Sequence, residues 1–307
     1  MGARSYAVIG VGAVGGWYGS RLALAGHAVH WVARSEREHL AEHGLVVDHP
    51  GGRDHLQDLR MEPDGHPDVV LVCTKSTADV GALVASIAGP DSLVVAMQNG
   101  FGVEATLAAA VPGRTVLGAM CFTCDNRVGP GHVRHLDYGR VTLGERRADG
   151  DAAGITQAVD AVADDLVAAG VPVTREPDLE RGRWKKLVWN IPYNGLSVVL
   201  DASTHELMAD PATRSLAADL MGEVVAASVS RGHAVDAGFV DAMLTDTVKM
   251  APYATSMKLD YDAGRPLEIA AIYDAPLAAA RGVGCEMPRT AALAAQLHFL
   301  DRRAGAG

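Results

Sequence analysis

The sequence predicts an α/β domain followed by an all-helical domain. Apolar strand segments alternate with helical segments in the first half, as in a parallel sheet covered on both faces. The strand signals stop after residues 171–173, and helical patterns follow to the end. A chain of 307 residues is long enough for two domains, and we place them at 1–175 and 176–307.

A glycine-rich turn follows the first predicted strand, residues 6–9. It reads Gly10-x-Gly12-x-x-Gly15 and leads into a helical segment over 17–25. In this context the glycines let backbone N–H groups approach a pyrophosphate, and the helix N-terminus presents its positive end to the same group. An ordinary glycine turn is the alternative, but the flanking strand and helix are those of a Rossmann-type dinucleotide-binding domain.

The second predicted strand, residues 28–32, indicates which dinucleotide binds. Enzymes that use NAD usually place Asp or Glu at its end to bind the ribose 2′-hydroxyl. This chain has Ala33-Arg34-Ser35 there, with no carboxylate before Glu36. Because Arg34 can pair with a 2′-phosphate through two parallel hydrogen bonds, we expect NADP(H). A solvated loop arginine is the alternative.

The other elements of the α/β domain follow in chain order. We predict strands over 69–74, 93–97, 116–123 and 141–144, with Gly129-Pro130-Gly131 as a turn, and helices over 77–87, 104–110 and 151–169. In the helical domain, Ser203 to Glu206 has the spacing of a capping box, and Asp210-Pro211 is a helix start. Two more helical segments follow Arg265-Pro266 and Met287-Pro288.

The segment around Lys186 carries the candidate chemistry. Lys186 and Asn190 lie one helical turn apart and share a face, which Asn194 extends if the helix continues. Hydride addition to a ketone leaves charge on oxygen, so a proton donor must stand beside it. A partly desolvated lysine suits this role, because burial lowers the pKa of an ammonium. From the spacing alone, a lysine that covers apolar surface with its stem is an equally good interpretation.

Composition restricts the partners and the compartment. The net charge of −10 disfavours nucleic acid and anionic membranes as partners. The first apolar run is a strand rather than a signal peptide, and no stretch is long enough to span a bilayer. Four cysteines without a disulfide framework favour the cytoplasm. Cys121 and Cys124, with His132 and His135 nearby, lack the spacing of a zinc site, so no metal is expected.

The motifs in their joint order resemble those of the ketopantoate reductase family along nearly the whole chain. The matching positions are the glycine motif, Arg34, Lys75, Gln98-Asn99-Gly100, Pro130-Gly131-x-Val133-x-His135, Lys186-x-x-x-Asn190-x-x-x-Asn194, Ser256-Met257 and Glu268-Ile269. Each motif alone is modest, but their order and spacing are hard to obtain by chance.

The resemblance implies roles for the residues of the helical domain. Lys186 would protonate the carbonyl oxygen as hydride arrives, and Glu268 would hold that lysine or the substrate hydroxyl. Ser256 would bind the carboxylate of a 2-oxo acid. Asn190 and Asn194 would bind its hydroxyl and carbonyl groups.

The resemblance also implies a cofactor site and a reaction. NADPH would be bound by Gly10, Gly12, Gly15, Arg34, Lys75 and Asn99, with Asn99 between nicotinamide and substrate. The reaction would reduce ketopantoate (2-dehydropantoate) to pantoate, a step of pantothenate biosynthesis. The alternatives are another branched or bulky 2-oxo acid, or an NADP(H)-binding protein without turnover. A small-molecule substrate is expected, and homodimer formation is left open.

Several residues depart from the family pattern. They are Gly195 in place of a proline after Asn194, Pro192 placed earlier, the bulky Trp189 and Tyr193, and Ala270 and Tyr273-Asp274 in place of Asp and Asn-Gly. Pro192 lacks an N–H and is expected to disturb the helix between the two asparagines. These changes leave Lys186 in place, so they bear on the substrate more than on the chemistry.

Overall fold

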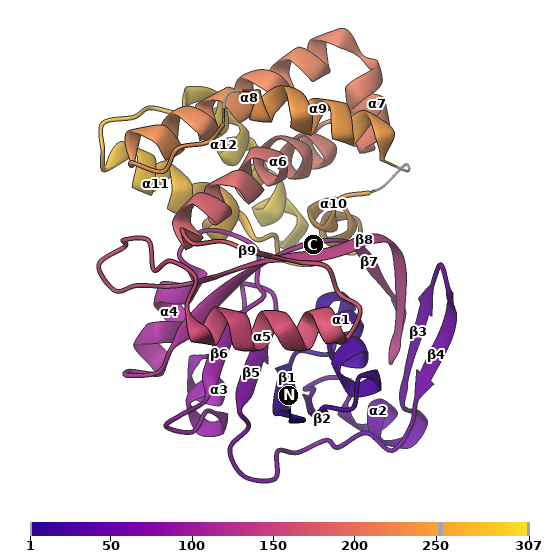
Figure 1. Ribbon diagram of the computed structural model, residues 1–307. Coiled ribbons are helices and arrows are strands. Elements are labelled where there is room, and N and C mark those ends of the chain that lie inside the picture. Colours follow the sequence, from indigo (N-terminus) through magenta and orange to yellow (C-terminus); the bar gives the residue numbers. More distant parts are fainter. Residues whose placement is uncertain (1, 237, 251–253, 306–307) are drawn as a thin grey trace. The chain divides into compact units, whose positions relative to one another are not determined.

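The computed structural model describes residues 2–236, 238–250 and 254–305 (Figure 1). The chain forms two compact units, which are Met1–Gln98 with Val103–Leu179, and Asn99–Gly102 with Glu180–Gly307. The first unit is α/β and the second is helical, which confirms the predicted fold class. The short segment Asn99–Gly102 belongs to the helical unit, although the sequence-based boundary lies far beyond it.

The first unit is built on one sheet. The described residues contribute nine strands in the order β2-β1-β5-β6-β7-β8-β3-β4, with β9 paired to β8. Strands β2, β1, β5, β6 and β7 are parallel, whereas β8 runs antiparallel to β7. The bounds are β1 Ser5–Ile9, β2 Ala28–Val32, β3 Leu45–His49, β4 Gly52–Leu56, β5 Val69–Val72, β6 Leu93–Ala96, β7 Val116–Gly129, β8 His132–Glu145 and β9 Val173–Arg175.

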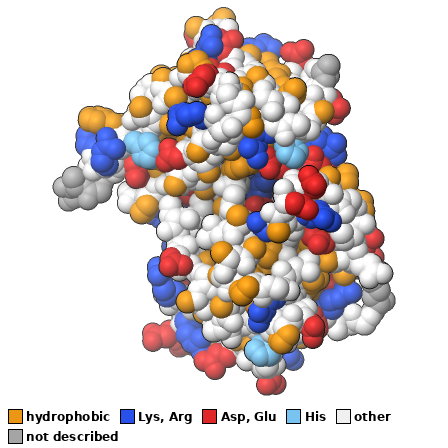
Figure 2. Space-filling model, turned by 90° about the vertical axis from the view of Figure 1, so that its left-hand side faces the viewer, with side chains coloured by type: hydrophobic (Ala, Val, Ile, Leu, Met, Phe, Trp, Pro, Cys, Tyr) orange, Lys and Arg blue, Asp and Glu red, His pale blue; other side chains and the backbone are white. Residues whose placement is uncertain are grey.

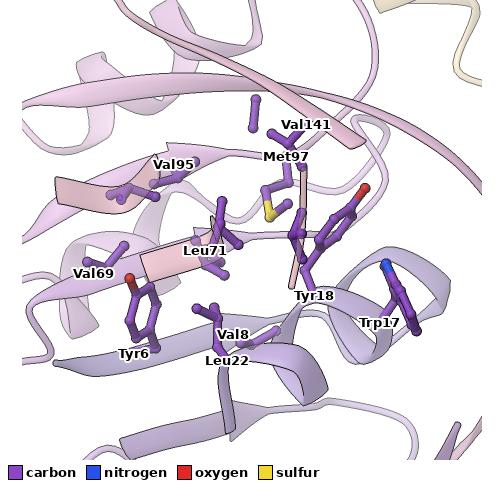
Figure 3. Close-up of a cluster of buried hydrophobic side chains, with 14 of the residues drawn as sticks. Tyr6, Val8, Trp17, Tyr18, Leu22, Val69, Leu71, Val95, Met97 and Val141 are labelled. Atoms are coloured by element: carbon purple, nitrogen blue, oxygen red, sulfur yellow. The ribbon is translucent and has the colours of Figure 1, made fainter. Parts of the chain in front are cut away.

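Helices cover this sheet. They are α1 Ala13–Leu24, α2 Arg37–His43, α3 Gly81–Ile87, α4 Val103–Ala110 and α5 Gln157–Ala168. Strand β5 is buried along its whole length, as its continuous apolar sequence predicts. Figure 3 shows side chains of α1 and of the strands packed together, including Leu22, Val8 and Leu71.

The sequence underestimates the β structure of this unit. The predicted strands over 116–123 and 141–144 are parts of one long hairpin, β7–β8, whose turn lies where Pro130 and Gly131 predict it. Register shifts beyond Phe122 interrupt the alternation on which the prediction depends. Helix α2 and strands β3 and β4 were not predicted, and of these β4 is mostly polar and exposed.

Two predicted helices begin later than expected. The helix predicted from residue 77 begins at Gly81, because the Asp79 side chain accepts a hydrogen bond from Gly81 N and forms a turn. The helix predicted from residue 151 begins at Gln157, where the Thr156 side chain caps the N-terminus by accepting from Val159 N. Hydrogen bonds between a side chain and the nearby backbone thus determine where both helices begin.

The second unit consists of helices around α6 (Figure 1). The bounds are α6 Leu179–Val199, α7 Thr204–Ala209, α8 Pro211–Ser230, α9 Phe239–Lys249, α10 Ser256–Asp262, the π-helix η1 Ala270–Asp274, α11 Ala275–Arg281 and α12 Pro288–Gly305. The capping box of Ser203 and Glu206 and the Asp210 cap are both present, as predicted. Helix α12 begins at Pro288, also as predicted.

The expected disturbance at Pro192 is wrong, because α6 is continuous from Leu179 to Val199. A proline removes one N–H donor from a helix. Here its neighbours Ile191 and Tyr193 are fully buried, and Tyr273 Oη donates to Ile191 O at 2.8 Å. Burial of these neighbours keeps the helix continuous through the proline, and the Tyr273 hydroxyl ties this turn of α6 to η1.

The surface carries charges of both signs. On the face drawn in Figure 2, Lys and Arg side chains are interspersed with Asp and Glu. No helix in the described part of the chain is long and apolar enough to cross a membrane.

Candidate active site

The turn between β1 and α1 is shaped by its glycines. Gly10 has φ +93°, and a Cβ on it would lie 2.9 Å from Thr74 N. A Cβ on Gly15 would lie 2.0 Å from Gly10 O. Packing within the unit therefore requires both glycines. Gly12 differs, because no atom lies within 4 Å of its Cβ position, so the backbone there is open to a ligand.

The start of α1 suits an anion. Gly12 is the N-cap, no side chain caps the first turn, and no acidic residue lies in that turn. The first amide N–H groups and the partial positive charge of this 12-residue helix therefore suit a pyrophosphate.

Two charged residues shortly after β2 differ in their surroundings, since Arg34 faces solvent and Glu36 is bonded to the protein. Arg34 is exposed. Glu36 accepts hydrogen bonds from Arg127 Nη1 and, at 3.1 Å, from Gly131 N, and its side chain is 13% exposed. Lys75, which follows β5, is also exposed, and its carbonyl accepts from Gln98 Nε2 at 3.2 Å.

The hairpin motif of residues 130–135 supports α1. A Cβ on Gly16 would lie 2.7 Å from Val133 Cγ2, so the helix and the hairpin are in close contact. The His135 ring stacks on Trp17 with centroids 3.7 Å apart, and its Nδ1 bonds to Asp125 Oδ1 at 2.6 Å. Burial raises the pKa of Asp125, although the hydrogen bond from His135 opposes this.

The predicted face of α6 exists in the second unit. Lys186, Asn190 and Asn194 are 9%, 3% and 1% exposed, so all three are buried along one continuous helix. Asn190 Nδ2 and Asn194 Oδ1 are buried without a hydrogen-bond partner. A buried amide atom left unpaired costs about 1–3 kcal/mol, and functional sites are where such atoms occur.

Two hydroxyls connect Ser256 to this face. Ser197 Oγ donates to Asn194 O at 3.1 Å and is hydrogen-bonded to Thr255 Oγ1 at 2.8 Å. Thr255 caps α10, whose first residue is the half-buried Ser256. The start of α10 is thus held beside the Asn194 turn of α6.

Glu268 lies just before η1, and η1 is bonded to α6. Glu268 is 4% exposed, and its carbonyl accepts from Ile272 N at 3.0 Å. Tyr273 Oη bonds to Ile191 O and also lies close to Gly195. A Cβ on Gly195 would be only 2.7 Å from this hydroxyl oxygen, so residue 195 must be small. Burial raises the pKa of Tyr273 well above its ordinary value, so its hydroxyl keeps its proton.

The segment that contains Asn99 packs on the same helices. Phe101 N donates to Ala271 O at 2.8 Å, and the Phe101 ring lies 4.9 Å from that of Trp184. A Cβ on Gly100 would lie 2.4 Å from Ala271 Cβ, which accounts for the glycine after Asn99. Asn99 therefore belongs to the same unit as Lys186.

The bulky residues of α6 face the interior of the helical unit. Trp189 Nε1 donates to Thr247 Oγ1 at 3.1 Å, and Tyr193 Oη bonds to Met208 Sδ at 3.0 Å. They are anchored on α9 and α7. No pattern in the sequence predicts the hydrogen bond of Tyr273, although this residue departs from the family pattern.

The cysteines and histidines of the hairpin have structural partners. Cys121 and Cys124 are both buried, and His132 Nε2 bonds to Asp48 Oδ2 at 2.8 Å. Among the described residues, no three His, Cys, Asp or Glu side chains are grouped to hold a metal ion.

An α/β unit with an open glycine loop, joined to a helical unit with a buried lysine and two amides, defines a dinucleotide-dependent oxidoreductase. Two family models match the chain: "Ketopantoate reductase PanE/ApbA" over residues 6–148 and "Ketopantoate reductase PanE/ApbA C terminal" over residues 178–301. The chain belongs to the ketopantoate reductase family, as its motifs predict.

Individual relatives agree with this assignment. The chain is 45% identical to the 2-dehydropantoate 2-reductase of Nostoc sp. over 99% of its own length and 97% of the relative's. The solved 2-dehydropantoate 2-reductase of Geobacter metallireducens has a TM-score of 0.88 and 35% identity, covering 96% of this chain and 99% of the other. That of Methylococcus capsulatus has a TM-score of 0.87 and 30% identity, covering 98% and 97%.

Proposed function

We propose that this protein catalyses the NADPH-dependent reduction of 2-dehydropantoate (ketopantoate) to pantoate. The observation that carries the proposal is the buried Lys186–Asn190–Asn194 face, in a chain 45% identical over 99% of its length to the Nostoc 2-dehydropantoate 2-reductase. A lysine and two amides on one buried helix face can protonate the carbonyl oxygen of a hydroxylated 2-oxo acid and bind its carbonyl and hydroxyl groups.

The two unpartnered amide atoms complement the substrate. Asn190 Nδ2 is a donor and suits a carbonyl oxygen, whereas Asn194 Oδ1 is an acceptor and suits a hydroxyl. 2-Dehydropantoate carries both groups. Binding would give each buried atom the partner that it lacks, and so recover the free energy that its burial costs.

Lys186 is the proposed general acid. NADPH supplies the hydride to the carbonyl carbon when it is bound. The Lys186 ammonium donates a proton to the carbonyl oxygen as negative charge develops there, and the neutral amine regains a proton from solvent. Glu268, buried in the same unit, orients that ammonium or the substrate hydroxyl. The Ser256 hydroxyl binds the carboxylate.

The proposed NADPH site of the first unit comprises the glycine loop, Arg34 and Lys75. The open backbone at Gly12 fits the pyrophosphate. Arg34 binds the 2′-phosphate, and Arg34→Ala should weaken NADPH binding by about 1.5–3 kcal/mol while leaving NADH binding nearly unchanged. Equal affinity of the intact protein for NADPH and NADH would contradict this choice of cofactor.

One observation favours a second substrate within the same chemistry. Gly195 and Tyr273 both depart from the family pattern and meet each other beside Asn194. Such a change next to a substrate-binding residue can alter which branched or bulky 2-oxo acid fits. The comparison of substrates must therefore extend beyond 2-dehydropantoate.

Loss of NADPH absorbance measured with a panel of 2-oxo acids tests the proposal. We expect the highest kcat/KM with 2-dehydropantoate and a product that co-elutes with pantoate. A higher kcat/KM for another 2-oxo acid would support the second substrate. Tight NADPH binding without oxidation by any member of the panel would instead indicate a binding protein without turnover.

A further inference from the structure

The tip of the β7–β8 hairpin packs against the residues that follow α2. Gly131 O accepts from Val46 N at 2.8 Å, and a Cβ on Gly131 would lie 2.9 Å from Gly44 O. Because its φ is +54°, this position favours glycine for conformation as well as for space. The tip is thus held firmly by contacts with the residues that follow α2.

From this tip the hairpin reaches the first carboxylate after β2. Gly131 N and Arg127 Nη1 donate to the two different oxygens of Glu36. The Glu36 side chain is 13% exposed, whereas that of Arg127 is 48% exposed. Each oxygen of the Glu36 carboxylate therefore accepts a hydrogen bond from the protein, and its negative charge is paired with the positive charge of Arg127.

Glu36 is close to the residue that is proposed to bind the 2′-phosphate. Two peptide units separate Glu36 from Arg34, so their Cα atoms are at most about 7.6 Å apart. An unpaired carboxylate there would repel a 2′-phosphate and could accept a hydrogen bond from a ribose 2′-hydroxyl, as the acidic residue of NAD enzymes does.

We propose that Arg127 is a specificity-determining residue for the cofactor. By pairing with Glu36 it neutralises the carboxylate that would favour NADH, two residues from the exposed Arg34. The inference rests on the proposed use of NADPH, and it gives a role to the hairpin that is separate from its support of α1.

Dissociation constants for NADPH and NADH, measured by nucleotide fluorescence without substrate, test this role. In Arg127→Ala the preference for NADPH should fall about five-fold or more, chiefly through weaker NADPH binding, because a negative charge near the phosphate is no longer paired. Adding Glu36→Gln should restore the preference by removing that charge. Arg53→Ala is the matched control, since Arg53 pairs with Asp48 instead.

The outcomes separate this inference from the proposed function. Equal affinities of the intact protein for the two nucleotides would overturn the choice of NADPH and, with it, the role of Arg127. A native preference for NADPH that Arg127→Ala changes no more than Arg53→Ala does would overturn the role of Arg127 alone. Equal weakening of both nucleotides would also overturn it, since it indicates support of the loop without selectivity. Arg127→Gln provides the same comparison if the alanine variant does not fold.

Discussion

Replacing Gly195 by alanine tests how closely η1 is packed against α6. Gly195 is buried inside α6, directly after Asn194. Its missing side chain leaves room for two neighbours, because a Cβ would lie 2.6 Å from Leu293 Cδ2 and 2.7 Å from Tyr273 Oη. Real Cβ contacts are not this short, so at least one neighbour must move.

The expected effect combines three contributions. Alanine in place of glycine inside a helix stabilises by about 0.5–1 kcal/mol. Forcing an extra methyl into a packed core costs about 1–3 kcal/mol. Displacing Tyr273 Oη from Ile191 O costs about 1 kcal/mol more. Gly195→Ala should therefore lower the free energy of unfolding by about 1–3.5 kcal/mol, with a fall in Tm of several degrees.

Thermal unfolding followed by circular dichroism measures this change. Gly222→Ala is the matched control, because Gly222 lies exposed in α8 with no atom within 4 Å of its Cβ position, and it should raise Tm slightly. In a Tyr273→Phe background the cost of Gly195→Ala should shrink, since one of the two close contacts disappears. If Gly195→Ala stabilises the protein as much as Gly222→Ala does, the packing argument is wrong.

Three further predictions concern the chemistry and the pH dependence. Lys186→Ala should lower kcat for NADPH oxidation about 100-fold or more, whereas Lys185→Ala, on another face of α6, should have a mild effect; similar kcat values would refute the assignment. Ser256→Ala should raise KM for 2-dehydropantoate more than it lowers kcat, and the opposite split in steady-state kinetics would contradict a role in carboxylate binding. Hydrogen bonds from Arg53 and His132 lower the pKa of Asp48 to about 2, so its stabilising effect is present above the unfolded pKa near 4 and is lost as the pH falls toward 2. Asp48→Asn should accordingly lower Tm at neutral pH but not near pH 2, and a pH-independent difference in Tm would refute this.

Local sequence patterns predicted the elements on which the candidate site residues lie. The glycine turn follows from three glycines between a strand and a helix, and the face of α6 follows from the four-residue spacing of Lys186 and Asn190. Helix starts with a strong capping residue, such as Asp210, were also predicted correctly. In each case the deciding interaction lies within a few residues along the chain.

Contacts between distant segments were beyond this reasoning. The bond from Tyr273 to Ile191 joins residues 82 positions apart, and the stacking of His135 on Trp17 joins two different elements. No periodicity encodes such pairs. The polar strand β4 was missed for a related reason, since its pairing with β3 rather than its own composition makes it a strand.

The departures of this chain from the family pattern are coupled in the structure. Tyr273 fills the space beside α6 with a ring and a hydroxyl, and residue 195 of α6 must then be glycine. The same hydroxyl bonds to the carbonyl of Ile191, the residue before Pro192, and so ties α6 to η1 next to the proline. A tyrosine, a glycine and a proline that look like separate exceptions in the sequence thus form one arrangement. It lies beside Asn190 and Asn194, so any change of substrate in this member of the family should depend on these three positions together rather than on one of them alone.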